Sequence, residues 1–525
     1  MSAFETPPPA LDAEKLATLA RRHWGLSGSL RPLVSERDQN ARLDAAGRRF
    51  VLKLSNPGED RGQLALQAAV LRHLEGQGME GIPQLIPTLT GADAVEEETG
   101  HGPGAVRLVT WVEGPLLSAA PRSMAQLESL GAFVGRFTRA MQGFGHPAAF
   151  RDGFLWSLDN AGLVEDWAAD IADPAQRALV AGLFARYRAR IAPRLSGLRA
   201  SVLHQDANDN NVIVDAANPD RVAGLIDFGD MAHGRTINEL AIAMAYALLD
   251  APDLYAAMRA MIVGHVAEFP ITEDEAAVLF DLMRMRLAMS VCISSRRARE
   301  HPGNDYLTIS QRPAFALLER LGRIDAEFMV ALCRKAAGFD ATRGVAEVRG
   351  FLAGTAVAPV VRPDPGRAAR LALLTDGTHP EMPAFSDRAF DAWFAAQRPA
   401  SLPANVAFLG FGPYGERRSV YATDQFADAA SPERRTRHTG IDIFAPKGTE
   451  VFAPLSGTVL SVTYNADPLD YGHTLILAHE TPSGARFFTL YGHLAGTLPG
   501  LVRAGQRVAA GDLVAHFGDW HENGG

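Results

Sequence analysis

Two short polar segments lie close together in the middle of the chain: residues 204–211 read His-Gln-Asp-Ala-Asn-Asp-Asn-Asn, and residues 226–231 read Ile-Asp-Phe-Gly-Asp-Met. The spacing His-x-Asp-x-x-x-x-Asn, followed by Ile-Asp-Phe-Gly, is the arrangement that a metal-dependent phosphoryl transferase needs. We expect Asp206 to orient the attacking hydroxyl and accept its proton. Asn211 and Asp227 are expected to hold Mg²⁺, a hard cation that prefers oxygen ligands. Either segment alone is equally well explained as a polar turn between strands, but the two together favour such a site.

A strand and a helix upstream are the elements that must complete this site. Residues 48–55 alternate with a period of two, which predicts a strand with Phe50, Leu52 and Leu54 on one face and Lys53 on the other. Lys53 is the candidate cation for the nucleotide phosphates, and a solvated surface lysine is the alternative. The following helix offers Gln67, which can accept a hydrogen bond from this lysine but cannot form an ion pair with it. No glycine-rich loop precedes the strand, so further phosphate contacts are expected from backbone amides or from Ser35, Arg37 and Asn40.

Composition narrows the function classes. The 525 residues allow about three domains, and 47% hydrophobic with 21% charged residues is typical of a globular protein. A net charge of −9 without a long basic run argues against nucleic acid or an anionic membrane as a partner. Cys292 and Cys333 are the two cysteines, so we expect buried thiols and no disulfide framework. The N-terminus lacks the features of an export signal, and the longest apolar stretch, residues 240–249, is about half a membrane span. These features together predict a cytoplasmic protein.

The chain divides by its patterns into parts of different class. Residues 1–343 read as a β-containing lobe followed by an α-rich lobe, with a hinge expected at residues 113–115, and this order resembles the α+β two-lobed arrangement of kinase-like folds. Residues 344–380 are rich in Pro and aperiodic, which predicts a linker. Residues 381–525 are expected to form a mostly β domain. Its predicted strands are residues 450–452, 457–464, 473–479, 486–491 and 512–517.

The β domain carries a second group of candidate ligands. His438 and Asp442 lie four apart in an extended, Gly-containing stretch, where both can turn toward one Zn²⁺ ion. A polar turn with an incidental histidine is the alternative. His493 stands near the end of another predicted strand. Short strands punctuated by Gly are typical of β-sandwiches with flat, lipoyl-like hairpins.

Residues 1 to about 340 resemble the aminoglycoside phosphotransferase and choline kinase superfamily, and within it the hydroxylysine kinases. The resemblance implies transfer of the γ-phosphoryl group of ATP or GTP to the hydroxyl of a small amino-containing alcohol, with Mg²⁺ as cofactor. Gln205, where Gly is usual, and Gln67, where an acidic residue often stands, depart from the pattern. The motifs that carry the resemblance are Asp38-Gln39-Asn40 before the Lys53 strand, His204-x-Asp206-x-Asn208-Asp209-x-Asn211, Asp227-Phe228-Gly229-Asp230-Met231, Glu239-Leu240-Ala241 and Asn304-Asp305-Tyr306-Leu307.

The acceptor is less well defined by the sequence than the reaction. A zwitterionic amino acid would need an acidic group for its ammonium and an arginine for its carboxylate. Asp230 and Glu239 are candidates for the first role, and Arg284 or Arg286 for the second. A structural or surface charge is the alternative for each of the four.

Residues 438–525 resemble the lysostaphin-type (LytM-like) zinc endopeptidases. His438 and Asp442 match two of that family's three zinc ligands, and His493 matches a catalytic histidine. The family's His-x-His element is not reproduced by His516 and His521, so we expect an incomplete zinc site and no peptidase activity.

Two explanations remain open for the incomplete β domain. The chain is a fragment of a longer protein, which we favour, or the domain is degenerate and serves for docking. Similar kinases are sometimes fused through such a domain to a pyridoxal-phosphate enzyme of the class III aminotransferase type. A zinc-binding, peptidase-like or peptide-binding protein with a non-catalytic kinase lobe is the contrasting hypothesis, and the oligomeric state, including a homo-oligomer, is open.

Overall fold

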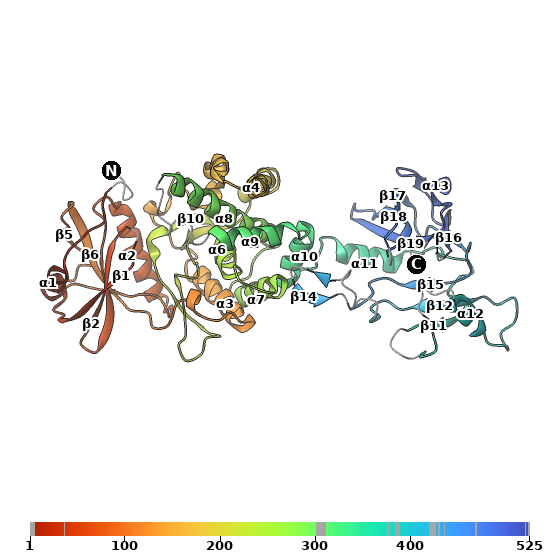
Figure 1. Ribbon diagram of the computed structural model, residues 1–525, viewed down its shortest axis with the longest axis horizontal. Helices are drawn as coiled ribbons and strands as arrows, with labels where there is room; N and C mark the ends of the chain where they lie inside the picture. Colours follow the sequence, from red (N-terminus) through yellow and green to blue (C-terminus); the bar gives the residue numbers. More distant parts are fainter. Residues whose placement is uncertain are drawn as a thin grey trace. The chain divides into compact units, whose positions relative to one another are not determined.

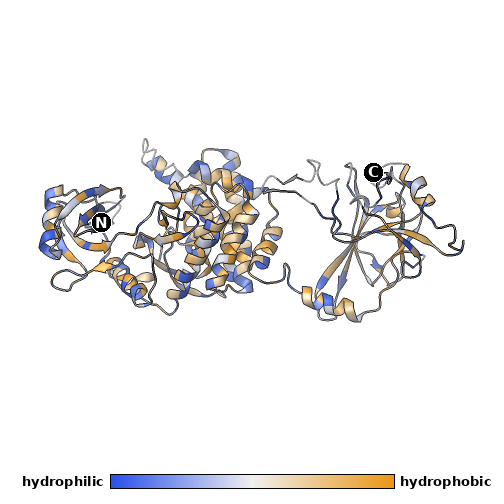
Figure 2. Ribbon diagram, turned by 90° about the horizontal axis from the view of Figure 1, so that it is seen from below, coloured by the Kyte–Doolittle hydropathy of each residue, from blue (hydrophilic) through white to orange (hydrophobic). Residues whose placement is uncertain are grey.

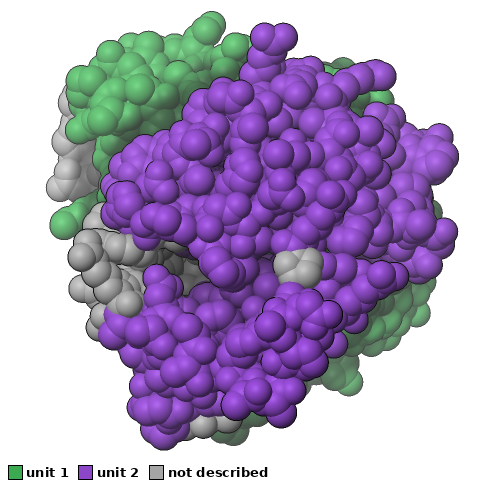
Figure 3. Space-filling view, turned by 90° about the vertical axis from the view of Figure 1, so that its right-hand side faces the viewer, with its two compact units in different colours: residues 1–341, 429–431 green, residues 342–428, 432–525 purple. Residues whose placement is uncertain are grey.

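The chain forms two compact units, Met1–Ala341 with Ala429–Ser431, and Thr342–Asp428 with Pro432–Gly525 (Figures 1 and 3). Each is described here by itself, from a computed structural model. The residues described are 6–35, 37–300, 311–362, 364–374, 379–383, 389–418, 427–428, 431–434, 436–467, 470–519 and 521–522. The motif at residues 304–307 therefore lies outside them. No helix in this described part is long and apolar enough to cross a membrane.

The first lobe of unit 1 is an antiparallel sheet in the order β1-β2-β3-β6-β4, with β5 also paired to β6. The predicted alternation in β3 is confirmed, because Phe50, Leu52 and Leu54 are buried. They form one cluster with helix α1, whereas α2 packs with the core on the other side of the sheet (Figure 1). The elements are α1 (Ala13–Trp24), β1 (Gly28–Leu33), β2 (Gln39–Ala45), β3 (Arg48–Leu54), α2 (Arg61–Gly76), β4 (Leu85–Ile86), β5 (Val95–Glu98) and β6 (Pro103–Thr110).

The second lobe is mostly helical, and its hydrophobic residues are spread along helices that pack on each other (Figure 2). Its first elements are η1 (Leu117–Ala119), α3 (Met124–Ala140), η2 (Pro147–Ala149), η3 (Leu158–Asp170), α4 (Pro174–Arg186), η4 (Tyr187–Ile191) and α5 (Ala192–Leu195). Its later helices are α6 (Ile237–Ala247), α7 (Leu254–Glu268), α8 (Glu273–Glu300), α9 (Gln311–Gly322) and α10 (Ala326–Ala336).

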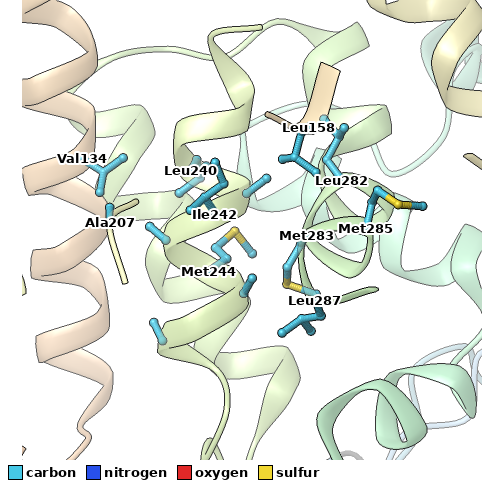
Figure 4. Close-up of a cluster of buried hydrophobic side chains, with 14 of the residues drawn as sticks. Val134, Leu158, Ala207, Leu240, Ile242, Met244, Leu282, Met283, Met285 and Leu287 are labelled. Atoms are coloured by element: carbon cyan, nitrogen blue, oxygen red, sulfur yellow. The ribbon is translucent and has the colours of Figure 1, made fainter. Parts of the chain in front are cut away.

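Close packing fixes the helices of this lobe. Side chains of α6 and α8, among them Ile242, Met244 and Met283, lie in one buried cluster (Figure 4). Helices α3 and α7 approach through glycine: a Cβ on Gly131 would lie 2.0 Å from the carbonyl oxygen of Met261. Any larger residue there would push the helices apart.

Two short two-stranded sheets of the second lobe carry the polar segments of the sequence. Strand β7 (Ala200–Leu203) pairs with β10 (Ala232–Arg235), and β8 (Val212–Val214) pairs with β9 (Val222–Leu225). The loop between β7 and β8 contains residues 204–211. The segment between β9 and β10 contains the single turn η5 (Phe228–Asp230). Both segments are thus anchored at each end by a paired strand.

Unit 2 is rich in strands, as expected. Its largest sheet has the order β19-β18-β17-β20, with further sheets β11-β12-β15 and β16-β21. Buried Val459, Leu475 and Leu477 are part of its core. The elements are α11 (Val345–Gly354), β11 (Ala369–Ala372), α12 (Ala389–Ala396), β12 (Phe408–Gly412), β13 (Ala427–Asp428), β14 (Ser431–Arg434), β15 (Asp442–Phe444), β16 (Glu450–Phe452), β17 (Gly457–Asn465), β18 (Gly472–Glu480), β19 (Arg486–Leu494), α13 (Leu498–Leu501), β20 (Arg507–Val508) and β21 (Leu513–His516).

The linker expected at residues 344–380 is not a plain linker. Helix α11 lies within it, and β11 pairs in parallel with β12. Both elements belong to unit 2, which begins at Thr342. Pro359 and Pro365 lie between α11 and β11 and interrupt neither element, so they did not indicate a linker.

Candidate functional site

The two polar segments of unit 1 are joined by His204. This ring is fully buried; its Nδ1 accepts a hydrogen bond from the Asp206 backbone N–H at 3.3 Å, and its Nε2–H donates to the Ile226 carbonyl at 3.0 Å. Burial lowers the pKa of His204 to about 4, so the ring is neutral and can both accept and donate. The Phe228 ring packs edge-on against it at 4.8 Å between centroids. His204 therefore fixes the loop after β7 relative to the segment after β9.

The Asp206 carboxylate is surrounded by side-chain donors. Its Oδ2 accepts from Asn211 Nδ2 at 2.8 Å, and its Oδ1 accepts from Asn208 Nδ2 at 2.9 Å. Arg286 Nη2 lies 3.4 Å from Oδ1. Burial raises the pKa of Asp206 to about 7, against the opposing charge of Arg286. The group is thus a carboxylate of fixed orientation, and its pKa is raised toward neutral pH.

Asp227 stands at the start of η5 with φ +65°, and its side chain accepts from the Gly229 backbone N–H at 3.3 Å. The positive charge of Lys53 is the largest influence on it and lowers its pKa. Lys53 comes from β3, where Asn40 of β2 and Arg107 of β6 are its neighbours in register. The structure therefore brings together the predicted lysine and the second predicted carboxylate, from different lobes.

Gln67 does not pair with Lys53 as expected. Its Oε1 accepts a hydrogen bond from Arg107 Nη1 at 2.8 Å, and both side chains are buried. A glutamine suits this place because it accepts from the guanidinium without adding a second charge to the interior. Arg107 was missed by the sequence analysis, although a lone arginine within the apolar strand Val106–Val109 is a readable signal.

More charged groups line this side of the sheet than the motifs alone predict. Arg37 Nη2 lies 3.2 Å from Asp230 Oδ1, so Asp230 faces an arginine. Arg151 Nη1 donates to the Met231 carbonyl at 3.3 Å. Burial raises the pKa of Glu59, which the charge of Arg37 opposes. Arg151 and Glu59 carry no motif and could not be singled out from the sequence.

The two remaining phosphate candidates lie on the same edge of the sheet lobe. Ser35 Oγ accepts from the Asp38 backbone N–H at 3.3 Å, a local turn contact. Asn40 lies opposite Lys53 in register, and its Oδ1 is buried without a hydrogen-bond partner among the described residues. Of the two, Asn40 is the better placed to contact a group beside Lys53.

Two of the candidates for acceptor recognition have other partners. Glu239 is buried in α6, and its Oε2 accepts from the His204 backbone N–H at 2.7 Å. Arg284 is buried against Asp281 and the Phe280 ring. Both side chains are thus bonded to other groups inside the lobe, which argues against the roles expected for them at an acceptor. Arg286, the fourth candidate, contacts Asp206 instead of facing solvent.

The groups expected to bind Mg²⁺ have suitable chemistry. The side-chain nitrogen of Asn211 donates to both the backbone carbonyl and Oδ2 of Asp206. The side-chain oxygen of Asn211 is therefore the atom that can bind a cation. Asp227 is ionised by its environment, as a magnesium ligand must be. An amide oxygen and a carboxylate on adjoining loops fit a hard cation held on phosphates.

The candidate zinc residues of unit 2 are also brought together. His438 Nδ1 lies 3.8 Å from Asp442 Oδ2. Burial lowers the pKa of His438, and His493 is close enough to contribute to the same shift. Asp442 is also bonded to the guanidinium of Arg418. His521 contacts Asp519, and His516 lies in β21. The described residues contain no group of three or more His, Cys, Asp or Glu that could hold a metal, so they supply two of the expected ligands without a third.

Comparison with known proteins agrees with this division. The model of the phosphotransferase enzyme family (APH) matches residues 29–264, and that of Peptidase family M23 matches residues 436–525. The chain also resembles an uncharacterized metalloprotease of Haemophilus influenzae, 33% identical over 117 residues, which are 21% of this chain and 22% of that protein.

Full-length relatives are found for the first unit. Hydroxylysine kinase of Danio rerio is 30% identical over 336 residues, covering 61% of this chain and 94% of that protein, and the enzyme of Mus musculus is 25% identical, covering 60% and 90%. Among solved structures, a microcompartment-associated aminopropanol kinase is 16% identical, with a TM-score of 0.47 over 63% of this chain and all of the other. The chain belongs to the phosphotransferase enzyme family, as a small-molecule phosphotransferase that acts on hydroxyl groups, and it carries a Peptidase family M23 domain at its C-terminal end.

Proposed function

We propose that unit 1 transfers the γ-phosphoryl group of ATP or GTP to the hydroxyl of a small amino alcohol or hydroxy amino acid of the 5-hydroxylysine type. The observation that carries the proposal is the held carboxylate of Asp206, with Asn211 bonded to it and Asp227 in the adjoining segment beside Lys53. The similarity to hydroxylysine kinases supports the acceptor class. We place the reaction in the cytoplasm, where nucleotide and Mg²⁺ are available.

In this mechanism Asp206 accepts the proton of the acceptor hydroxyl as its oxygen attacks the γ-phosphorus. The bond from that phosphorus to the bridging oxygen breaks, and its electron pair stays on the nucleoside diphosphate. Asn211 and Asp227 would hold Mg²⁺, which would supply positive charge to the phosphates. Lys53 adds a positive charge from the sheet lobe, while Gln67 holds Arg107 behind it. Burial raises the pKa of Asp206, so this carboxylate accepts a proton more readily than an exposed one.

The test compares two aspartates of one loop. Asp206→Asn removes the proton acceptor and should lower kcat by about two to four orders of magnitude. Asp209→Asn is the matched control, because this carboxylate turns away toward Arg122 at 3.5 Å. Asp227→Ala should abolish Mg²⁺-dependent nucleotide binding.

Release of ADP or GDP is measured with a panel of hydroxy amino acids, amino alcohols, choline and aminoglycosides. We expect 5-hydroxylysine or a close amino alcohol to give the highest kcat/KM. Near-wild-type turnover of Asp206→Asn contradicts the assignment of the base. Choline or an aminoglycoside as the best acceptor contradicts the acceptor class.

A further inference from the structure

A buried arginine stands behind the proposed base. Arg286 of α8 is 1% exposed. Its Nε donates to the Tyr246 hydroxyl at 3.1 Å, its Nη1 to the Trp156 carbonyl at 2.6 Å, and its Nη2 lies 3.4 Å from Asp206 Oδ1. The guanidinium also lies over the Trp156 and Tyr246 rings, 4.7 Å and 5.5 Å from their centroids. Each of its three nitrogens is thus engaged, and its orientation is fixed from several sides.

The charge of this arginine needs a counter-charge nearby. A guanidinium out of contact with water is costly unless it is paired and hydrogen-bonded. Tyr246 and the Trp156 carbonyl are neutral, and among the described residues Asp206 supplies the carboxylate within ion-pair distance. Arg284, two residues earlier in α8, pairs instead with Asp281. The charge of Arg286 is therefore compensated by the carboxylate proposed to accept the proton.

We propose that Arg286 is a positioning residue: it holds the Asp206 carboxylate in the orientation needed to receive the acceptor's proton, and it does not bind the acceptor. This inference rests on Asp206 being the base of the proposed function. It differs from the expectation that Arg286 captures an acceptor carboxylate, since this side chain is closed to solvent and each of its three nitrogens is already bonded to a group inside the lobe.

Two predictions separate positioning from substrate binding. Arg286→Met should lower kcat about 10- to 100-fold by the same factor for 5-hydroxylysine and for 1-amino-2-propanol, which lacks a carboxylate, while nucleotide affinity changes less than about twofold. In the Asp206→Asn background the same substitution should cost less than about threefold, because its partner carboxylate is already absent. Arg286→Lys keeps the charge and should recover part of kcat.

Tyr246→Phe is the matched control. It removes one hydrogen bond from the guanidinium but leaves the charge and the ring in place, so a loss of about threefold or less, equal for both acceptors, is expected. If Arg286→Met does not bind nucleotide and so has not folded, the same cycle is run with Arg286→Lys.

The outcomes distinguish the possible failures. A loss confined to the carboxylate-bearing acceptor would overturn the inference and make Arg286 a substrate contact. An equal loss with and without Asp206→Asn would also overturn it, since the arginine would then act independently of the base. Undiminished turnover in Asp206→Asn alone would instead refute the proposed function.

Discussion

Glu239→Gln tests how the loop that carries Asp206 is held. Glu239 is buried in α6 and binds the His204 backbone N–H at 2.7 Å. Burial raises its pKa from an ordinary value of 4.5 to about 7. Between these values the folded chain keeps a proton that the unfolded chain has lost. The folded state binds more protons in this window, so the contribution of Glu239 to stability falls as the pH rises from 4.5 through 7.

The size of the effect follows from the two pKa values. One pKa unit corresponds to about 1.4 kcal/mol, so the free energy of unfolding loses about 3 kcal/mol across this window through Glu239. Glutamine keeps an oxygen that can accept from His204 but does not ionise. The variant therefore gains about 3 kcal/mol relative to wild type between pH 4.5 and pH 8, on top of any constant cost of the new amide.

Urea unfolding of the full chain at several pH values measures this difference. The chain has two units, so more than one transition is expected, and the one that shifts in the variant reports on unit 1. The difference between variant and wild type is the diagnostic quantity, because other buried groups change the wild-type curve in both directions. A difference that stays constant within about 1 kcal/mol from pH 4.5 to 8 would refute the reasoning.

Two further substitutions probe buried groups of the same lobe. Burial lowers the pKa of His265 from 6.5 to about 4, so the wild type loses stability as the pH falls through this window. In the same urea series, the stability of His265→Gln relative to the wild type should rise by about 3 kcal/mol as the pH falls from 6.5 to 4. The relative stability of Glu239→Gln should change in the opposite direction with pH. Gln205 has φ +68°, so Gln205→Gly should be more stable than Gln205→Ala by about 1 kcal/mol, and a melting comparison giving the reverse order would contradict the strain.

Local patterns predicted most of the strands of unit 2 that follow residue 450. Every predicted strand from residue 450 onward is present. These strands could be recognised from the local sequence, because each is a short run of alternating apolar and polar residues bounded by Gly or Pro. The same local evidence failed at residues 344–380. There β11 exists because β12 lies beside it in parallel, and such a partner about 40 residues away leaves no trace in the local composition.

The site residues were predictable where the reaction requires a fixed spacing along the chain. They were not predictable where the partner of a side chain depends on how the folded elements pack. Lys53 and Asp227 could be named from motif positions, and the structure places them close together. The partner of Gln67 depends on the strand that lies next to β3, which brings Arg107 to it. Glu239 was a candidate for binding the ammonium group of the acceptor, but its side chain accepts from a backbone N–H inside the lobe, a contact that depends on how α6 packs.

The loop that carries Asp206 is held from the helical side. Glu239 of α6 binds its backbone, and Arg286 of α8 binds its carboxylate. The neutral ring of His204 then links this loop to the segment that begins with Asp227. The base and the proposed metal ligands therefore share one lobe, whereas Lys53 belongs to the other. A change in the separation of the lobes would alter the contacts of the nucleotide phosphates with Lys53 without disturbing the geometry of Asp206. Phosphate binding by Lys53 and proton acceptance by Asp206 therefore depend on different sets of contacts.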